Sequence, residues 1–401
     1  MLSNSERAKG VQTRRSIPNA ISSLVLIFSL VLVSCQNEDV NHSQTPIKHS
    51  PQLATKSVAE VKYATCFSIR TEDNIRKIQI KNPFKNYKVQ QTIVLLPKGN
   101  HYEEKKGELV VSIPIQSIVP FSASYISMID TLEALETIVG IDNKNYIYNP
   151  KLQLRIKEGA VKELGNISTL NLEQMAMIQP QVVVYTGYSG EESKISQKLS
   201  AMGISNLLNY DWKETHPLGR AEWIKFFGAL YDKEQEANQI FEYIEQEYLK
   251  LKEQPKENEP QILFNSLYNG VWYVPGGESY VAQLVIDAGG IYPWASNEST
   301  GSLPLSFETI VSEAAAPDVW LNSNFSSVQE MLQADERYSL FLKSVGDRLY
   351  NQNKRLSPLG GNDYFETGVL RPDIVLNDYI QMFQNKDCTT SDLYFFTKLK
   401  D

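Results

Sequence analysis

The sequence has little histidine and little cysteine. Its 401 residues include four histidines and three cysteines. Three of the histidines (His42, His49 and His101) lie near the N-terminus, which leaves only His216 in the rest of the chain. A site for a bare zinc, manganese or iron ion normally combines several histidine and carboxylate ligands. The composition therefore argues against such a metal site.

Recognised catalytic motifs are also missing. The chain contains no H-E-x-x-H, no G-x-x-x-x-G-K-[ST] and no G-x-S-x-G sequence, so the usual zinc-protease, phosphate-loop and nucleophile-elbow patterns are absent. The segment Gly187-Tyr188-Ser189-Gly190 falls one residue short of the last pattern. Acid pairs such as Glu191-Glu192 lie in polar loop sequence and do not indicate a glycosidase. We predict that the protein is not an enzyme.

Long hydrophobic runs are absent, and the one apolar run near the N-terminus, residues 21–33, is too short to span a bilayer comfortably. It follows a basic region and ends in Leu32-Val33-Ser34-Cys35. That tetrad resembles the lipobox of bacterial lipoproteins, in which the cysteine is lipidated and becomes the first residue. We predict a lipoprotein signal peptide over 1–34 and lipidation at Cys35. A plain signal peptide followed by an unrelated cysteine is the alternative. The basic residues are Arg7, Lys9, Arg14 and Arg15.

Basic residues are fewer than acidic ones, 39 against 47. The formal net charge is −8, and loss of residues 1–34, with four basic residues and one acid, brings it near −11. This acidity argues against nucleic acid as a partner. Residues 35–56 are polar and predict a tether. The segment Gln36-Asn37-Glu38-Asp39 is similar to acidic clusters that export some Bacteroidetes-type lipoproteins to the cell surface. The alternative is that it is only part of a solvated linker.

Residues 57–111 predict a small β appendage. Apolar and β-branched runs alternate with turn residues, as in YATCFSIR, KIQIKN, VQQTIVLLP and ELVV. No set of ligand-type side chains occurs here, so we expect the appendage to pack on the lobe that follows. Its Cys66 and the distant Cys388 form either one disulfide or two buried thiols.

Residues 112–218 alternate between strand and helix patterns. Short apolar runs typical of buried parallel strands are separated by stretches of helical periodicity. The short loops indicate a parallel sheet covered on both faces. We expect a strand that starts at Ser117 and runs into a polar turn, further strands at 138–141, 182–185 and 204–208, and helices at 125–135, 171–178 and 194–202.

Residues 219–254 predict linking helices. A short helix in GRAEWIKFFGALY precedes a long one over 233–253, with Asp232 as its N-cap and Pro255 as its stop. A helix of this length spans roughly 30 Å, about the width of a small domain. Its apolar face consists of Ala237, Phe241, Ile244, Tyr248 and Leu251.

The strand and helix alternation resumes over residues 255–386, and 387–401 are expected to form a tail. One sequence motif, a proline followed by Asp or Gln and three apolar residues, occurs once in each lobe. The two copies are Gln179-Pro180-Gln181-Val182-Val183-Val184 and Ala316-Pro317-Asp318-Val319-Trp320-Leu321. The lobes are therefore variants of one unit. The predicted fold class is α/β, with two Rossmann-like lobes that contain central parallel sheets and are joined by one long α-helix, plus the small N-terminal β appendage.

The order and spacing of these features over 113–384 resemble the periplasmic substrate-binding proteins of ABC importers that take up iron–siderophores, haem and cobalamin. Phrases such as PLGRAEW at 217–223 and WYVPGG at 272–277 are similar to those of Bacteroidetes-type lipoproteins in that family. The resemblance implies a monomer that delivers a small-molecule metal chelate to an ABC permease and its ATPase. An outer-membrane receptor that acts earlier in uptake is a further candidate partner. Other features that carry it are Ser122-Ala123-Ser124, Leu164-Gly165 before Asn171-Leu172-Glu173, Gly289-Gly290 and Gly360-Gly361-Asn362-Asp363-Tyr364.

The resemblance also assigns docking residues. In relatives, one surface glutamate on each lobe enters an arginine pocket of the permease, and the matching positions here are Glu173 and Glu308. A carboxylate near a helix N-terminus is favoured by the helix dipole and can accept two hydrogen bonds from arginine. Stabilisation of the first helical turn is the alternative role.

The ligand would bind between the lobes, where the carboxyl ends of the parallel strands meet. Aromatic and amide groups there suit a flat or polycyclic ligand with polar edges. Arg220 is the expected contact for an anionic chelate, or else it forms a surface salt bridge with Glu222 or Glu214. The candidate ligand-binding residues are Ser122, Ser124, Tyr125, Tyr188, Trp212, Arg220, Trp272, Tyr273, Trp294, Asn324, Asn362 and Tyr364.

The preferred cargo is an iron–siderophore, with cobalamin or haem as the alternatives, and no resident cofactor or metal is expected. His216 is either a loop residue or an axial ligand to haem iron or cobalt. A cell-surface lipoprotein enzyme or adhesion module that reuses the fold is the rival from another class. The implied location is the cell envelope, facing the periplasm or exposed at the cell surface, with Cys35 as the anchor.

Overall fold

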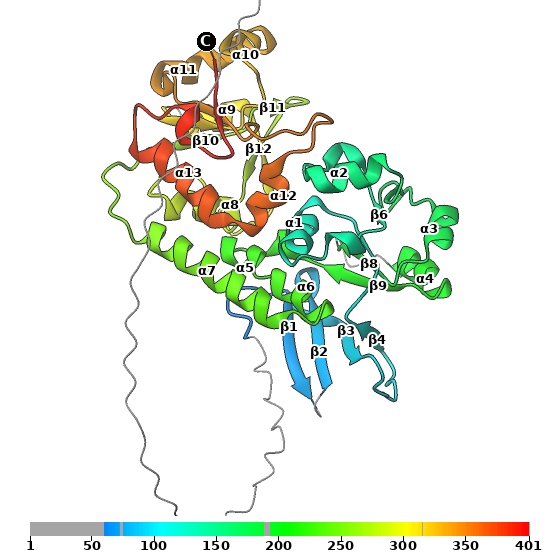
Figure 1. The fold of residues 1–401 in the computed structure, drawn as a ribbon. Helices are drawn as coiled ribbons and strands as arrows, with labels where there is room; N and C mark the ends of the chain where they lie inside the picture. Colours follow the sequence, from blue (N-terminus) through cyan, green and yellow to red (C-terminus); the bar gives the residue numbers. More distant parts are fainter. Residues whose placement is uncertain (1–59, 73–74, 188–192, 315, 401) are drawn as a thin grey trace, which may run out of the picture. The chain divides into compact units, whose positions relative to one another are not determined.

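A computed structural model describes residues 60–400, apart from 73–74, 188–192 and 315 (Figure 1). The expected signal peptide, the tether and Cys35 therefore lie outside the described residues, as does Tyr188. Within the described part of the chain, no helix is both long enough and apolar enough to cross a bilayer.

The predicted β appendage is present as a four-stranded sheet, with β1 (Phe67–Glu72), β2 (Ile75–Asn82), β3 (Lys88–Pro97) and β4 (Glu108–Ile113) paired in that order. The first three strands are antiparallel, whereas β3 and β4 run parallel. Ile78 and Ile80 of β2 and Ile93 of β3 are fully buried. Alternate residues thus face the core, as in a sheet with one covered face.

The first lobe has a parallel sheet in the order β5 (Ile118–Pro120), β8 (Val182–Thr186) and β9 (Ser205–Asn209). Val182, Val183 and Val184 are fully buried, which fits a strand covered on both faces. The predicted alternation of strands and helices over residues 117–208 is confirmed. The lobe also contains the parallel pair β6 (Gly140–Ile141) and β7 (Lys162–Glu163) and the helices α1 (Ala123–Thr131), α2 (Pro150–Lys157), α3 (Leu172–Ile178) and α4 (Ser193–Ala201).

Gln91 of β3 attaches the appendage to the edge of this sheet. Its side-chain amide donates to the backbone oxygen of Asn206 at 2.7 Å, and its Oε1 accepts the backbone N–H of Leu208 at 3.1 Å. The side chain thus takes the place of a neighbouring strand along β9. An edge strand covered in this way is protected from pairing with another chain.

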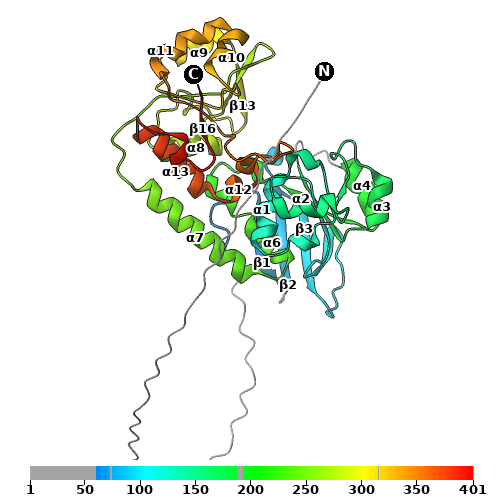
Figure 2. The same cartoon turned by 45° about the horizontal axis from the view of Figure 1, so that its top comes forward.

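Three helices connect the lobes: α5 (Pro217–Ala221), α6 (Ile224–Leu230) and α7 (Glu234–Lys252). Figures 1 and 2 show α7 passing both lobes, with α6 at its start and α13 (Pro372–Gln384) beside its later turns. The predicted apolar face is confirmed, because Ala237, Phe241, Ile244 and Tyr248 are buried. The predicted N-cap is wrong. Lys233 holds that position, and Asp232 has a φ of 57° and pairs with Arg76 at 2.8 Å.

The second lobe has parallel strands β10 (Ile262–Phe264), β14 (Val319–Leu321) and β15 (Leu349–Asn351), with β16 (Thr397–Lys398) antiparallel at the edge. The Trp272 and Trp320 rings stack in its core with centroids 5.8 Å apart. A separate antiparallel sheet comprises β11 (Leu267–Tyr268), β12 (Val271–Pro275) and β13 (Ser302–Leu305). The remaining helices are α8 (Tyr280–Asp287), α9 (Phe307–Glu313), α10 (Val328–Ala334), α11 (Ser339–Val345) and α12 (Asp363–Leu370).

The C-terminal segment and the two cysteines each bear on a prediction made from the sequence. Residues 387–400 do not form a tail, because β16 pairs with β15 and Phe395 and Phe396 are buried in the second lobe. Cys66 and Cys388 are both buried free thiols. The disulfide alternative is therefore wrong.

Candidate functional site

A cavity of about 400 Å³ lies between the two lobes, within the usual size range of small-molecule sites. The start of α1 and the segment around α5 form one wall. The start of α8, the residues before β13 and one face of α12 form the other. The lining residues are Ser122, Ala123, Ser124, Trp212, Arg220, Asn265, Pro275, Ser279, Tyr280, Val281, Thr300, Gly301, Ser302, Phe365 and Val369.

A connected polar group forms the wall on the side of the first lobe. Ser122 and Ser124, at the start of α1, have their hydroxyl oxygens 2.9 Å apart. Ser124 donates to Asp211 Oδ2 at 3.4 Å, and Arg220 Nη2 donates to the same oxygen at 2.9 Å. Three separate segments of the chain thus hold these side chains in place. Four predicted residues, Ser122, Ser124, Trp212 and Arg220, line the cavity together.

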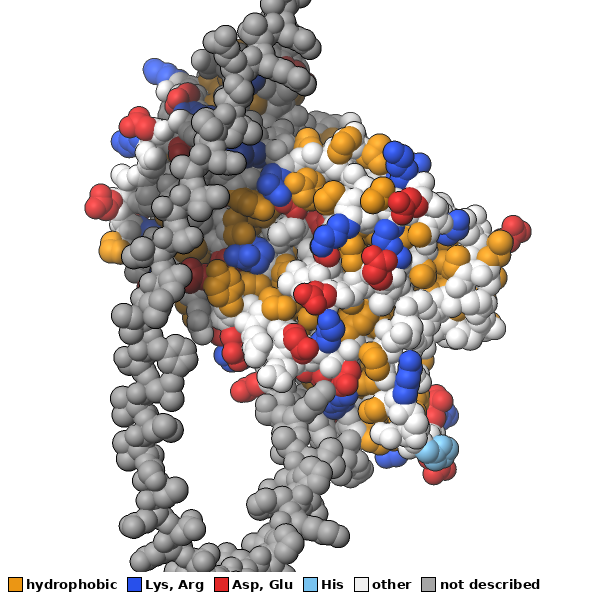
Figure 3. Space-filling view, in the orientation of Figure 1, with side chains coloured by type: hydrophobic (Ala, Val, Ile, Leu, Met, Phe, Trp, Pro, Cys, Tyr) orange, Lys and Arg blue, Asp and Glu red, His pale blue; other side chains and the backbone are white. Residues whose placement is uncertain are grey.

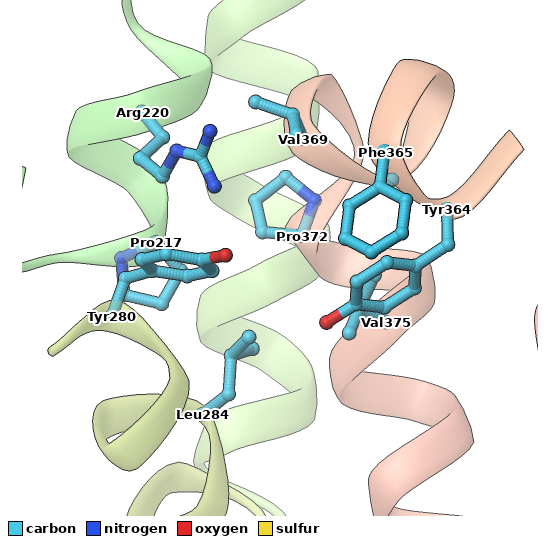
Figure 4. A pocket seen from close by; sticks show the side chains of 10 residues that line it. Pro217, Arg220, Tyr280, Leu284, Tyr364, Phe365, Val369, Pro372 and Val375 are labelled. Carbon is cyan, nitrogen blue, oxygen red and sulfur yellow. The ribbon is translucent and has the colours of Figure 1, made fainter. Parts of the chain in front are cut away.

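Arg220 is the cation of this wall and is only 9% exposed. Its guanidinium carbon lies 4.4 Å from the centre of the Tyr280 ring, a cation–π distance, and Figure 4 shows it extending from α5 into the space beside Tyr280. Its ion-pair partner is Asp211, so the predicted salt bridge with Glu222 or Glu214 is wrong. Arg220 Nε is buried and has no hydrogen-bond partner among the described residues.

The wall on the side of the second lobe depends on a glycine turn. A Cβ on Gly276 would lie 2.1 Å from the backbone oxygen of Ser299, and one on Gly277 would lie 2.4 Å from that of Asn297. Only glycine lets the chain pass this loop so closely. The turn delivers Ser279, which caps α8 by accepting the Ala282 N–H at 3.2 Å. Tyr280 then follows at the cavity wall.

Sequence reasoning missed every lining residue of this wall, among them Ser279, Tyr280, Thr300 and Phe365. For Ser279 and Tyr280 a signal existed, because they open a helix directly after a strand and a Gly-Gly turn. Thr300 and Phe365 come from a loop and from an exposed helix face, and no local pattern distinguishes them.

A second hollow of about 320 Å³ shares Phe365 with the cavity. Asn362 caps α12 there, accepting the N–H of Tyr364 at 3.0 Å and donating to the backbone oxygen of Gln352 at 2.8 Å. The predicted residues Asn324 and Asn362 thus line this hollow and not the cavity. Its lining residues are Asn324, Phe325, Ser326, Glu330, Asn351, Gln352, Asn353, Asn362 and Phe365.

The other candidate residues lie elsewhere. Tyr125 and Trp272 have no exposed surface and belong to the core of their lobes. Trp294 is 6% exposed, and its indole donates to the Glu313 carboxylate. Tyr273 is on the outward face of β12, since alternate residues of a strand face opposite sides.

Tyr364 lines a small apolar pocket of about 20 Å³ next to the cavity. Figure 4 shows its ring across this pocket from Tyr280, with Leu284 and Val375 nearby. The pocket shares Arg220, Tyr280, Phe365 and Val369 with the cavity. Its size leaves no space for a ligand, so Tyr364 supports the cavity wall.

His216 supports a helix. Its Nδ1 accepts the N–H of Leu218 at 3.1 Å, which caps α5, and its ring lies 5.0 Å from the Tyr63 ring. Burial lowers the pKa of this imidazole. It does not line the cavity. Among the described residues, no cluster of three or more His, Cys, Asp or Glu side chains is arranged to hold a metal ion.

The two candidate docking glutamates lie in equivalent places. Glu173 is in the first turn of α3, capped by Asn171, and Glu308 is in the first turn of α9, capped by Ser306. Both side chains are exposed. On the face shown in Figure 3, acidic and basic side chains are interspersed and neither sign forms a large patch. The glutamates are therefore available to a partner as local charges.

Solved structures of binding proteins resemble this chain. An ABC transporter substrate-binding protein from Listeria monocytogenes aligns with a TM-score of 0.50 and 20% identity over 68% of this chain and 100% of its own. A periplasmic haem-binding protein of Vibrio cholerae gives 0.51 and 18% over 65% and 98%. A periplasmic binding protein from Veillonella parvula gives 0.53 and 12% over 80% and 99%. At these identities the likeness establishes the two-lobed fold.

An uncharacterized lipoprotein of Methanocaldococcus jannaschii is 26% identical over 409 residues, covering 94% of this chain and 95% of that one. A second uncharacterized lipoprotein of the same organism is 26% identical over 255 residues, or 60% and 64% of the two chains. Residues 118–342 match the family described as periplasmic binding protein, which is more than half of the chain. The chain therefore belongs to the periplasmic binding protein family.

Proposed function

We propose that this protein is the substrate-binding lipoprotein of an ABC importer and that it captures a small metal chelate between its lobes, with an iron–siderophore as the preferred cargo. The interlobe cavity is the observation that carries the proposal. Its volume of about 400 Å³ suits a small molecule, and both lobes supply its walls. Neither lobe alone would enclose such a ligand.

The chemistry of the lining supports a chelate with a flat body and polar edges. Trp212, Tyr280 and Phe365 offer aromatic surface, and the serine and threonine hydroxyls can donate or accept hydrogen bonds. Arg220 adds a guanidinium group to the lining, and Asp211 balances its charge.

Cobalamin is the second candidate, with haem third. The amide-rich hollow beside the cavity favours cobalamin, because asparagine and glutamine side chains pair well with a ligand whose rim carries amides. His216 caps a helix and so does not support axial ligation of haem.

Delivery would proceed through an ABC permease and its ATPase, with Glu173 and Glu308 as docking contacts. A lipid on Cys35 would hold the protein in the cell envelope, facing the periplasm or at the cell surface, and an outer-membrane receptor is an additional candidate partner. The rival from another class, a cell-surface enzyme or adhesion module, predicts no chelate binding. The family match favours a binding protein.

Isothermal titration calorimetry of the full chain tests the proposal. The probes are a ferric tris-catecholate, a ferric tris-hydroxamate, cyanocobalamin and haemin. We expect one of them to bind with a Kd in the micromolar range or below, and Phe365→Ala to weaken that binding about tenfold through loss of stacking. Tyr268→Ala, at a side chain 69% exposed and outside the cavity, is the matched control. Failure of all four probes at high micromolar concentration would contradict the proposal.

A further inference from the structure

The β2–β3 turn of the appendage reaches the rim of the cavity. The Phe84 ring, in this turn, lies 6.1 Å from the Trp212 ring and 6.3 Å from the Tyr210 ring. Trp212 itself lines the cavity. The family match begins only at residue 118, beyond the appendage. This contact with the site therefore comes from a part of the chain outside the matched residues.

The turn is built to hold two aromatic side chains outward. Fully buried Asn82 accepts the Phe84 N–H on its side chain at 2.8 Å and the Tyr87 N–H on its backbone oxygen at 2.9 Å. Asn86 and Tyr87 have φ of 53° and 54°, a region that a bulky residue occupies at a cost of about 1–3 kcal/mol. Phe84 and Tyr87 are nevertheless each 42% exposed.

Lys213 lies against this turn and crosses to the other lobe. Its Nζ is 5.0 Å from the centre of the Phe84 ring and 4.9 Å from that of Trp212. The same nitrogen donates to Thr300 Oγ1 at 3.0 Å, and Thr300 lines the cavity from the second lobe. Lys213 is thus a cation beside two rings, with its hydrogen bond directed at the cavity wall.

The two cations near the cavity differ in charge balance. Arg220 forms an ion pair with buried Asp211 at 2.9 Å. Lys213, in contrast, has no carboxylate partner among the described residues. An uncompensated, partly desolvated cation gains most from an anion that arrives with a ligand. Within the part of the chain that the structure describes, the cation without a carboxylate partner therefore lies at the rim of the cavity.

We propose that Lys213, with Phe84 of the appendage and Trp212, forms a rim site for an anionic group on a planar part of the cargo, such as a carboxylate or a catecholate oxygen. The aromatic side chains cover the planar part and the ammonium group binds the anion, in exchange for its bond to Thr300. This inference rests on the proposed function, since it names the charge class of the cargo.

The test compares chelates that differ in charge. The full chain is titrated calorimetrically with an anionic ferric tris-catecholate and a neutral ferric tris-hydroxamate. We expect Lys213→Met and Phe84→Leu each to weaken binding of the anionic chelate about tenfold and that of the neutral chelate less than twofold. Lys213→Arg retains affinity. Added salt should weaken the binding of the anionic chelate to the unaltered protein. It should weaken binding to the Lys213→Met variant less.

Two controls come from the same turn and strand. Lys85→Met removes an exposed lysine of the turn, and Val89→Ala trims a side chain 49% exposed on β3. Both variants should bind like the unaltered protein. Equal affinity of Lys213→Met and the unaltered protein for the anionic chelate, or binding of the neutral chelate alone, overturns the rim site and leaves the proposed function standing. Absence of binding by either chelate, cyanocobalamin and haemin overturns both.

Discussion

The carboxylate of Glu366, on α12, accepts the backbone N–H of Tyr148 at 2.8 Å and so fastens a helix from the second half of the chain to the first lobe. Its other oxygen accepts the N–H of Asn149 at 3.1 Å. Glu366 is 2% exposed, and α12 packs against α1. Since α12 also lines the cavity through Phe365 and Val369, the lobes are connected beside the ligand site as well as along α7.

This contact predicts a pH dependence of stability. Burial raises the pKa of Glu366 from its ordinary 4.5 to about 8, against the opposing effect of the two N–H groups. Between these values the folded protein binds more protons than the unfolded chain. The free energy of unfolding from this group therefore falls as pH rises from about 4.5 to about 8, by at most about 1.4 kcal/mol per pH unit. Chemical denaturation at pH 5, 6, 7 and 8 should show a shallower fall for Glu366→Gln.

The exposed Glu236→Gln serves as the control for that experiment and should follow the unaltered protein at every pH. Parallel curves for Glu366→Gln and the unaltered protein would show that Glu366 does not titrate in this interval.

Glu222 is predicted to hold the segment that precedes β1. Fully buried, it accepts the backbone N–H groups of Lys62, Tyr63 and Ala64 at 2.8, 2.7 and 2.9 Å and pairs with Lys225 at 2.7 Å. Glu222→Gln leaves Lys225 buried without its counter-charge, which costs about 3–5 kcal/mol. Thermal denaturation should show the loss, and hydrogen exchange should accelerate at residues 62–64. Unchanged exchange there would contradict this role, and Glu236→Gln should change neither quantity.

Arg220 and Asp211 should behave as a coupled pair. Arg220→Met leaves the Asp211 carboxylate, 2% exposed, without its cation, and we expect a loss of about 3–5 kcal/mol. Adding Asp211→Asn to the Arg220→Met variant removes the unpaired negative charge. This double variant should therefore be more stable than Arg220→Met alone. A double-mutant cycle from denaturant unfolding measures the coupling. Strict additivity would mean that the pair contributes no interaction energy.

Removal of the two docking glutamates should separate binding from delivery. Neither Glu173 nor Glu308 lines the cavity, so Glu173→Ala with Glu308→Ala should leave chelate affinity unchanged and reduce uptake through the reconstituted permease at least tenfold. Glu253→Ala, at an exposed position after α7, is the control. Parallel loss of affinity and uptake would remove the docking assignment.

The periodic elements were the predictable part of the fold. The 3–4 spacing of Ala237, Phe241 and Ile244 reports a helix with one buried face, and α7 differs from the prediction only at its ends. The run Val182 to Val184 likewise predicts a strand buried on both faces. Local physics suffices in these cases, because burial and periodicity are properties of neighbouring residues.

The site was predicted only in part, because its geometry depends on distant residues. From the sequence, Trp272 and Tyr273 are equally suitable as ligand contacts. The structure shows that β12 directs Trp272 into the core and Tyr273 outward. The polar sequence around Cys388 hides the burial of Phe395 and Phe396. The bond of Glu366 to Tyr148 joins residues 218 positions apart, and no local pattern in the sequence encodes it.

The hydrogen bonds that hold residues 60–66 determine where a pulling force on the chain would act. Lys225 Nζ donates to the backbone oxygen of Glu60 at 2.7 Å, and Glu214 accepts the N–H groups of Thr65 and Cys66 at 2.7 and 3.0 Å. Lys225 lies in α6, and Glu214 lies just ahead of α5. A pull on the preceding chain thus reaches the connecting helices first and loads neither central sheet directly. Because Arg220 of α5 and Trp212 near Glu214 line the cavity, such a pull would also act on the cavity wall of the first lobe.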